Sequence, residues 1–265
     1  MMTHFDAAIL GIVEGITEYL PVSSTGHLII AGRFLNLPES EALKSYDIVI
    51  QFGAILAVVG LYREQVLKMF KGLFGKDKDG LHLFICLVIS CLPIMLIGLP
   101  LKSKIEESLF SVKTVAWALL LGGVVMIAIE TLLKKTQNAL ELMTYRAALL
   151  IGLVQCLALI PGTSRSMVTI FGAILCGFSR KKAAEYSFLL ALPVLSGACL
   201  IGFLESHEVI LNDFGMLNVL IGMSVSCLVA ALSIQLLITV VNRFGFIGFG
   251  VYRILAGIFI MIYLL

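Results

Sequence analysis

The fold of this chain is decided by residues 11–27, which read GIVEGITEYLPVSSTGH. The stretch begins as an apolar helix that carries Glu14 and Glu18, which a helix places on one face about one turn apart. Pro21 ends this helix, and a run of hydroxyl side chains follows it up to His27. Acids, hydroxyls and an imidazole are costly inside an apolar, membrane-like sequence, so they indicate a functional site by default.

The composition indicates an integral membrane protein with an all-α fold. Of the 265 residues, 60% are hydrophobic and only 14% are charged, whereas a soluble globular domain is about 25% charged. The mean hydropathy is +1.05. The net charge of +2 is small and no basic tract with interleaved aromatic residues is present, so nucleic acid is not expected as a partner.

A membrane-spanning helix requires about 20 apolar residues. Six such transmembrane helices are expected, at residues 47–62, 81–100, 112–133, 185–204, 216–241 and 248–265. Two other apolar stretches, 8–36 and 147–178, are each interrupted by a proline followed by polar residues. We interpret each as a re-entrant helical hairpin, because irregular backbone at membrane depth is tolerated only where protein or water surrounds it. The alternative is that each is a plain kinked span.

The two interrupted stretches indicate an internal repeat. When the sequence is displaced by 140 positions, Pro21 falls on Pro161 and Ser24 falls on Ser164. The identities are few, but they include both helix-breaking prolines and a serine of each loop.

Each half of the chain then holds one hairpin and three spans. Because three is odd, the second half enters the membrane from the opposite side, which is an inverted-topology repeat. We expect one membrane domain over residues 1–265, with repeat one at about 1–135 and repeat two at about 140–265. The two hairpin tips then meet near the middle of the bilayer.

Basic residues in the short loops predict the orientation, because cytoplasmic loops carry an excess of lysine and arginine. One side of the expected topology holds most of them, at Arg63, Lys68, Lys71, Lys76, Lys78, Lys134, Lys135, Arg146, Arg180, Lys181, Lys182 and Arg243. This side is expected to be cytoplasmic, so that both termini and the mouth of the first hairpin face outward. Residues 63–80 are expected to form the longest polar loop.

The second hairpin loop begins Pro161-Gly-Thr-Ser-Arg-Ser and continues to Thr169. Gly162 permits a close approach of the backbone to a ligand. Hydroxyl residues cap a helix N-terminus, which is itself a binding site for anions, and Arg165 adds a planar fork that suits phosphate oxygens. The loop therefore predicts a phosphate site, although the lysine and the glycine spacing of a Walker loop are missing. The alternative is that Arg165 only neutralises a buried carboxylate of the first hairpin.

The first hairpin tip complements the second. Ser24 is a candidate nucleophile, Glu18 or His27 is a candidate base, and Glu14 with Glu18 could hold a divalent cation. Three alternatives stay open: the hydroxyls act only as helix caps, the imidazole is a satisfied polar group, and the carboxylates bind a transported proton or sodium ion. Candidate phosphate-binding residues from both tips are Ser23, Thr25, Gly162, Thr163, Ser164, Ser166 and Thr169.

Two positions outside the tips also interrupt apolar spans. Arg253, early in the last span, is expected to snorkel to the interface or to pair with an acid. Gly122 is expected to allow close packing of helices.

The two tips resemble the two signature motifs of the bacterial undecaprenyl-diphosphate phosphatases, also called the bacitracin-resistance phosphatases. The motifs read Glu14-x-x-x-Glu18 with Pro21-Val-Ser-Ser-Thr-Gly-His27, and Pro161-Gly-Thr-Ser-Arg-Ser-x-x-Thr169. The resemblance covers essentially the whole chain, including Met143-Thr-Tyr-Arg146 and Tyr252-Arg253.

This resemblance implies an enzyme that removes the terminal phosphate of undecaprenyl diphosphate, recycling the carrier lipid of peptidoglycan synthesis and conferring resistance to bacitracin. It also implies a divalent cation, Mg²⁺ or Ca²⁺, and a homodimer. The protein is then expected to be a multi-pass protein of the bacterial cytoplasmic membrane, with its active site open to the outer face.

The resemblance also implies roles for single residues. Ser24 resembles the family's nucleophile, Glu18 the group that activates it, His27 the essential histidine and Arg165 the phosphate-binding arginine. Glu14 matches a position where the family has Glu or Gln, so it suits a metal or hydrogen-bond contact better than a base.

A polyprenyl-phosphate transporter or flippase is the alternative function, because inverted repeats with broken helices are a transporter architecture. A transporter would move the lipid without releasing phosphate. For the phosphatase, a covalent phosphoserine and a direct attack by water both fit the residues.

Overall fold

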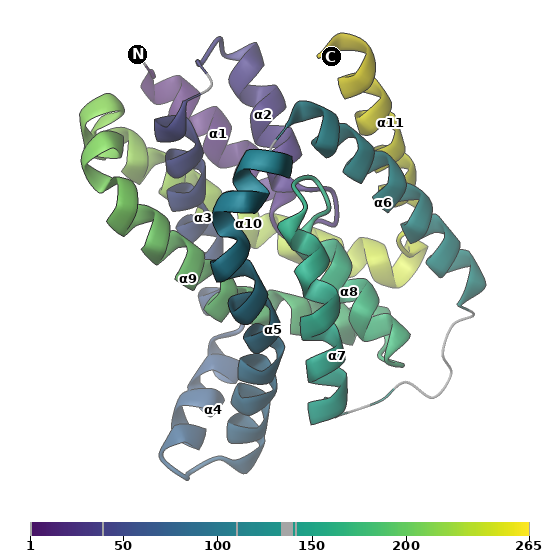
Figure 1. Cartoon of the computed structure of the whole chain (residues 1–265). Coiled ribbons are helices and arrows are strands. Elements are labelled where there is room, and N and C mark those ends of the chain that lie inside the picture. Colours follow the sequence, from purple (N-terminus) through teal and green to yellow (C-terminus); the bar gives the residue numbers. More distant parts are fainter. Residues whose placement is uncertain (1, 39, 110, 134–139, 141, 265) are drawn as a thin grey trace.

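The computed structural model contains helices and no strand in the part of the chain that it describes, residues 2–38, 40–109, 111–133, 140 and 142–264 (Figure 1). The elements in chain order are α1 His4–Thr17, α2 Ser24–Phe34, α3 Glu41–Leu61, α4 Arg63–Leu73, α5 Lys78–Leu109, α6 Val112–Leu132, α7 Tyr145–Gln155, the 3-10 helix η1 Cys156–Leu159, α8 Arg165–Leu175, α9 Arg180–Asp213, α10 Gly215–Phe244 and α11 Ile247–Tyr263. The all-α prediction is confirmed.

Five helices of the described chain are long and apolar enough to cross a membrane, namely α3, α5, α6, α9 and α10. The sixth expected span, residues 248–265, coincides with α11, which has 17 residues and is shorter than the other five. Each expected span is therefore helical, and the fold is that of a multi-pass membrane protein.

Each interrupted stretch forms two short helices joined by a loop. The side chains of Thr3 and Thr144 cap α1 and α7 by accepting hydrogen bonds from backbone N–H groups of the first turn. In Figure 1, α1 enters from the end of the molecule that carries both termini, and α7 enters from the opposite end. The Ser166 hydroxyl donates a 3.0 Å hydrogen bond to the Leu20 carbonyl, so the two loops are in contact.

The helix caps show which residues of the two hairpins are structurally equivalent. Ser23 caps α2 and Ser164 caps α8, both helices have 11 residues, and both serines have a φ of 75°. Positions 23 and 164 lie 141 apart, so the ungapped displacement of 140 residues is wrong at the loops. Ser24 corresponds to Arg165, because each is the first residue of its helix. Sequence identity alone could not distinguish the capping serine from its neighbour in Ser23-Ser24.

The two halves of the chain interlock through close helix contacts. Helix α1 packs on α10 of the other half, and α7 packs on α5. A Cβ atom at Gly11 would lie 2.6 Å from the Gly222 carbonyl oxygen, and one at Gly152 would lie 2.5 Å from that of Ser90. Glycine at these positions lets the backbones of neighbouring helices touch.

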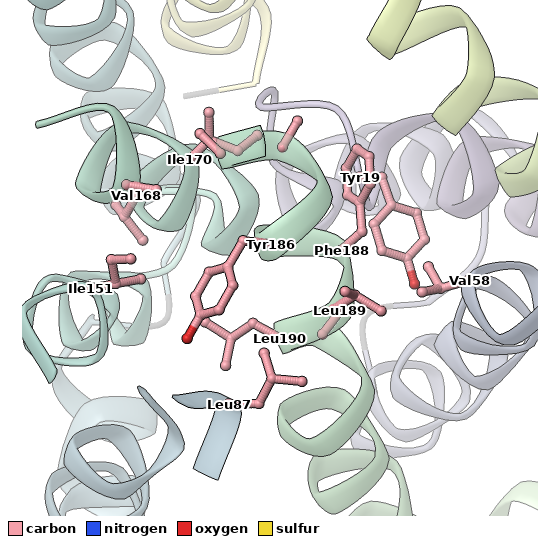
Figure 2. Packing of buried hydrophobic residues seen from close by; sticks show 14 of the residues in the cluster. Tyr19, Val58, Leu87, Ile151, Val168, Ile170, Tyr186, Phe188, Leu189 and Leu190 are labelled. Carbon is pink, nitrogen blue, oxygen red and sulfur yellow. The ribbon is translucent and has the colours of Figure 1, made fainter. Parts of the chain in front are cut away.

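The largest buried cluster joins both hairpins to α9 (Figure 2). It contains Tyr19 of the first hairpin, Ile151 and Ile170 of the second, and Phe188 of α9. The rings of Tyr19 and Phe188 meet edge to face with 5.4 Å between their centroids, a favourable aromatic geometry. The loop ends of the hairpins are thus held by a packed apolar core.

The prediction that residues 63–80 form a polar loop is wrong, because α4 occupies most of the segment. Met69 is buried, and Gly72 and Gly80 allow α4 to pack closely against α5. The prediction followed the many charged residues of this segment and overlooked its apolar residues, which a helix brings together on one face.

Candidate active site

The Glu18 carboxylate, at the C-terminal end of α1, joins the two hairpins. The Ser24 hydroxyl donates a 2.8 Å hydrogen bond to Oε2 of Glu18. The Nη2 group of Arg165 donates a 2.8 Å hydrogen bond to Oε1 of the same carboxylate. Glu18 is 6% exposed, and buried charge-assisted hydrogen bonds of this kind are strong and directional. The structure therefore brings Glu18, Ser24 and Arg165 into one partly buried cluster.

The two helices that begin at these loops present their N-termini to a common cavity. The cavity has a volume of about 140 Å³ and is lined by Glu18, Ser23, Ser24, Thr25, Gln51, Ala158, Ile160, Pro161, Gly162, Ser164, Arg165 and Leu195. A volume of about 10–15 Å³ is enough for one water molecule, so this cavity can hold a much larger group. Helix N-termini attract anions through their free N–H groups and dipoles.

The backbone of both loops is held in a conformation that non-glycine residues rarely adopt. Ser23 and Ser164 have a φ of 75°, and Gly162 has a φ of 91°. A Cβ at Gly162 would lie 2.8 Å from the Val115 Cα, so only glycine fits there. Left-handed non-glycine residues each cost about 1–3 kcal/mol and occur preferentially at functional sites.

Arg165 uses two of its five N–H donors in the hydrogen bonds that the structure shows. Its Nη1 donates 2.9 Å to the Ser187 carbonyl, and its guanidinium lies 5.8 Å from the centroid of the Tyr19 ring. Its Nε is buried and has no hydrogen-bond partner within the described residues. Arg165 does neutralise Glu18, as one of the two interpretations expected, and it also lines the cavity.

Glu14 lies one helical turn before Glu18 and is fully buried. Neither of its carboxylate oxygens has a hydrogen-bond partner in the described part of the chain. No group of three His, Cys, Asp or Glu side chains that could hold a metal ion occurs among the described residues. Unsatisfied carboxylate oxygens suit Mg²⁺ or Ca²⁺, but the remaining ligands of such an ion would have to be other oxygens, such as those of a bound diphosphate.

An apolar groove of about 730 Å³ runs beside the polar cavity, between α6 and the second hairpin. It is lined by Lys113, Thr114, Trp117, Ala118, Leu121, Gly122, Val125, Met126, Ile129, Val154, Leu157, Ile160, Thr163, Met167, Val168, Phe171, Gly172 and Leu175. Ile160 borders both the groove and the cavity. A ligand with a charged head and an apolar tail could therefore occupy both.

Comparison with known proteins identifies the family. The family model for bacitracin resistance protein BacA matches residues 7–259. The chain belongs to the BacA family.

Three relatives illustrate how complete this similarity is, and all three are named undecaprenyl-diphosphatase. The protein from Rhizorhabdus wittichii is 44% identical over 266 residues, covering 100% of this chain and 98% of the relative. The protein from Sorangium cellulosum is 42% identical over 265 residues, covering 98% of this chain and 86% of the relative. The protein from Deinococcus deserti is 41% identical over 259 residues, covering 97% of this chain and 94% of the relative.

Three further polar residues of the second BacA motif, Thr163, Ser166 and Thr169, are not in the lining of the polar cavity. Thr163 lines the apolar groove. Ser166 is buried and bonded to the first loop, and Thr169 bonds to the Ser187 hydroxyl at 2.6 Å. The hydroxyls of Ser166 and Thr169 stabilise the loop instead of lining the polar cavity.

His27 turns away from the polar cavity of this BacA-family chain. Its Nδ1 lies 2.7 Å from the Ser23 carbonyl oxygen, and its Nε2 lies 2.6 Å from the Tyr252 hydroxyl. The two rings also stack, with 5.5 Å between centroids. The imidazole thus connects the capped end of α2 to α11, and its catalytic role stays a prediction.

Gln51 of α3 lines the cavity beside the motif residues, and the motifs do not include it. The available signal was an amide side chain inside the apolar span 47–62. Because α3 is distant in sequence from the second loop, only the packing of the fold shows that this amide reaches the site.

Proposed function

We propose that this chain hydrolyses undecaprenyl diphosphate to undecaprenyl phosphate and inorganic phosphate, and so recycles the carrier lipid of peptidoglycan synthesis and confers resistance to bacitracin. The observation that supports this most directly is the single Glu18 carboxylate, which holds a hydroxyl from one hairpin and a guanidinium from the other beside one cavity. The names of the relatives agree with this function and do not favour the transporter alternative.

In the proposed reaction, Ser24 Oγ attacks the terminal phosphorus in line with the bridging oxygen. Glu18 Oε2 already accepts the hydrogen bond from Ser24, so it can take the proton. Arg165 and the N-termini of α2 and α8 stabilise the charge that spreads over the phosphoryl oxygens. Undecaprenyl phosphate leaves, and water then cleaves the phosphoserine.

A direct attack by a water molecule that Glu18 activates fits the same geometry without a covalent intermediate. Acid quenching during turnover with a substrate labelled in the terminal phosphate separates the two routes, since only the first leaves label on Ser24.

Glu14 and Glu18 would hold a divalent cation, Mg²⁺ or Ca²⁺, which would supply electrostatic stabilisation of the diphosphate oxygens. The support for this assignment is the pair of buried Glu14 oxygens without a partner among the described residues; of the two carboxylates, Glu18 alone lines the polar cavity.

The proposed membrane arrangement has six spans and two re-entrant hairpins in an inverted-topology repeat. The opposite entry of α1 and α7 supports it (Figure 1). The basic residues of α4 and of the start of α9 are then cytoplasmic, the cavity opens to the outer face of the bacterial cytoplasmic membrane, and the apolar groove takes the polyprenyl chain. A homodimer remains a prediction, which the mass of the purified protein in detergent tests.

The experiment that tests the function measures phosphate release by the purified protein in detergent from undecaprenyl diphosphate, before and after treatment with a chelator. We expect release in the untreated sample, its loss on chelation and its recovery when Mg²⁺ or Ca²⁺ is restored. Full activity after chelation would contradict the cation. A protein that moves the lipid across liposomes without releasing phosphate would instead be a transporter.

A further inference from the structure

Arg253 is the largest fully buried side chain in the described part of the protein, and it lies on α11. The expectation that it snorkels or pairs with an acid is wrong, since no carboxylate of the described residues contacts it. Its guanidinium instead donates to three backbone carbonyls: Nη1 to Pro21 at 3.2 Å, and Nη2 to Ala118 at 3.0 Å and to Gly162 at 3.1 Å. Burying a charge is costly unless hydrogen bonds compensate for it, and here carbonyl dipoles do so.

The three carbonyls belong to three separate parts of the site. Pro21 is in the first loop, Gly162 is in the second loop, and Ala118 is on α6. Pro21 lies three residues before Ser24, and Gly162 lies three residues before Arg165. One side chain therefore holds the segments that carry the two reactive groups, at equivalent points of the two hairpins.

Gly122 makes room for this guanidinium. A Cβ at Gly122 would overlap Nη2 of Arg253 and would lie 3.1 Å from its Cζ. The next residue, Gly123, faces a different part of α11, because a Cβ there would lie 2.6 Å from the Gly250 backbone oxygen and its other nearest atoms belong to Ile254. A substitution at Gly122 would therefore disturb the arginine, whereas one at Gly123 would disturb the packing of α6 against α11.

We propose that Arg253 is a positioning residue for the phosphatase reaction. By binding both loops, it keeps Ser24 and Arg165 within hydrogen-bonding distance of Glu18. This inference rests on the proposed function. Because misplacing reactive groups by about 1 Å can cost on the order of a hundredfold in rate, losing the carbonyl contacts should reduce kcat. KM should change little, since the apolar groove and the donors of Arg165 remain.

The test compares Gly122→Ala with Gly123→Ala by kcat, KM and thermal unfolding of the purified proteins. Gly122→Ala displaces only the end of a flexible side chain, so it should lower kcat by at least roughly tenfold. Because Gly122 also lines the apolar groove, KM is compared with a short-chain diphosphate, for which it should stay within about twofold. Gly123→Ala strains backbone against backbone, so it should lose more thermal stability while keeping kcat within about threefold. Equal losses of kcat in the two variants would overturn the inference, because helix packing alone would then explain them.

Substitution of the arginine itself provides a second readout. Arg253→Met should lower kcat, and Arg253→Lys should restore part of it, because the ammonium can still donate to carbonyl oxygens. Ordinary kcat in Arg253→Met would contradict the role. A wild-type protein without phosphate release would contradict the proposed function instead, so the two failures are distinguishable.

Discussion

At the scale of single residues, Glu18 has its two carboxylate oxygens occupied by different partners. Ser24 binds one oxygen and Arg165 the other, each at 2.8 Å. If the Glu18–Arg165 pair served only to neutralise charge, the second oxygen of Glu18 would not need a hydrogen bond from Ser24. The hydroxyl on Oε2 gives the carboxylate a proton to accept, and the guanidinium on Oε1 fixes its orientation.

Ser24→Ala should abolish phosphate release, with a loss on the order of a thousandfold or more in kcat, because the nucleophile is removed. The unfolding temperature should change little, since only one hydrogen bond is lost. Ser179→Ala is the control: it removes the N-cap of α9, so it should lose about 1 kcal/mol of stability with ordinary turnover. Phosphate assays and thermal unfolding of both proteins check this, and an active Ser24→Ala protein would contradict the assignment.

Arg165→Lys should lower kcat/KM by on the order of a hundredfold, although the charge is kept. The guanidinium donates simultaneously to Glu18 and to the Ser187 carbonyl, and a single ammonium cannot reproduce this fork. Kinetics at saturating and limiting substrate measure the effect. Near-normal kcat/KM in the lysine variant would indicate that only charge matters at this position.

At the scale of elements, the two hairpins are structurally equivalent but chemically different. Each uses a serine with a φ of 75° to cap an 11-residue helix. The residue after the cap is Ser24 in one hairpin and Arg165 in the other. One loop geometry thus occurs twice, with the proposed nucleophile Ser24 at one copy and the proposed phosphate-binding Arg165 at the other.

Glycines on α3 allow a test of how closely the helices must pack. A Cβ at Gly53 would overlap the backbone of Met223 on α10, whereas nothing lies within 4 Å of one at Gly60. Gly53→Ala should therefore destabilise the protein by about 1–3 kcal/mol. Gly60→Ala should leave stability unchanged or raise it by about 0.5–1 kcal/mol, because alanine favours a helix. Thermal unfolding in detergent measures both, and equal midpoints would contradict the packing of α3 on α10.

At the scale of the whole molecule, the arrangement places a polar cavity next to an apolar groove, with Ile160 between them. The hairpins supply most of the cavity, with Gln51 of α3 and Leu195 of α9 completing it, and α6 with the second hairpin supplies the groove. This combination suits a substrate with a diphosphate head and a long hydrocarbon tail.

Filling the groove should weaken binding of long-chain substrates only. Val125 lines the groove and is 50% exposed, whereas its neighbour Val124 is 49% exposed and does not line it. Val125→Trp should raise KM for undecaprenyl diphosphate at least roughly tenfold, since each buried CH₂ contributes about 0.8 kcal/mol, and should leave KM for a short-chain diphosphate unchanged. Val124→Trp is the matched control and should change neither value. A uniform effect of Val125→Trp on both substrates would contradict the placement of the tail.

The sequence by itself determined the helical membrane fold and the main candidates at the site. Long apolar runs must be helices in lipid, because each backbone group is then satisfied locally. The two breaks after Pro21 and Pro161 were visible because a cluster of hydroxyl residues follows each proline, whereas Pro93, Pro100 and Pro193 have apolar neighbours and lie inside helices. Glu18, Ser24 and Arg165 were noticeable because polar side chains in apolar segments are costly.

Only the tertiary structure decided which of these groups meet. The contact between Glu18 and Arg165 spans 147 residues, and no local pattern specifies a partner at that distance. The same applies to Gln51, which reaches the cavity from α3, and to Arg253, which binds carbonyls of both loops. Hydrophobic periodicity fixes the face that a helix buries, whereas the complementarity of packed side chains fixes what lies against that face, and this complementarity exists only in the folded protein.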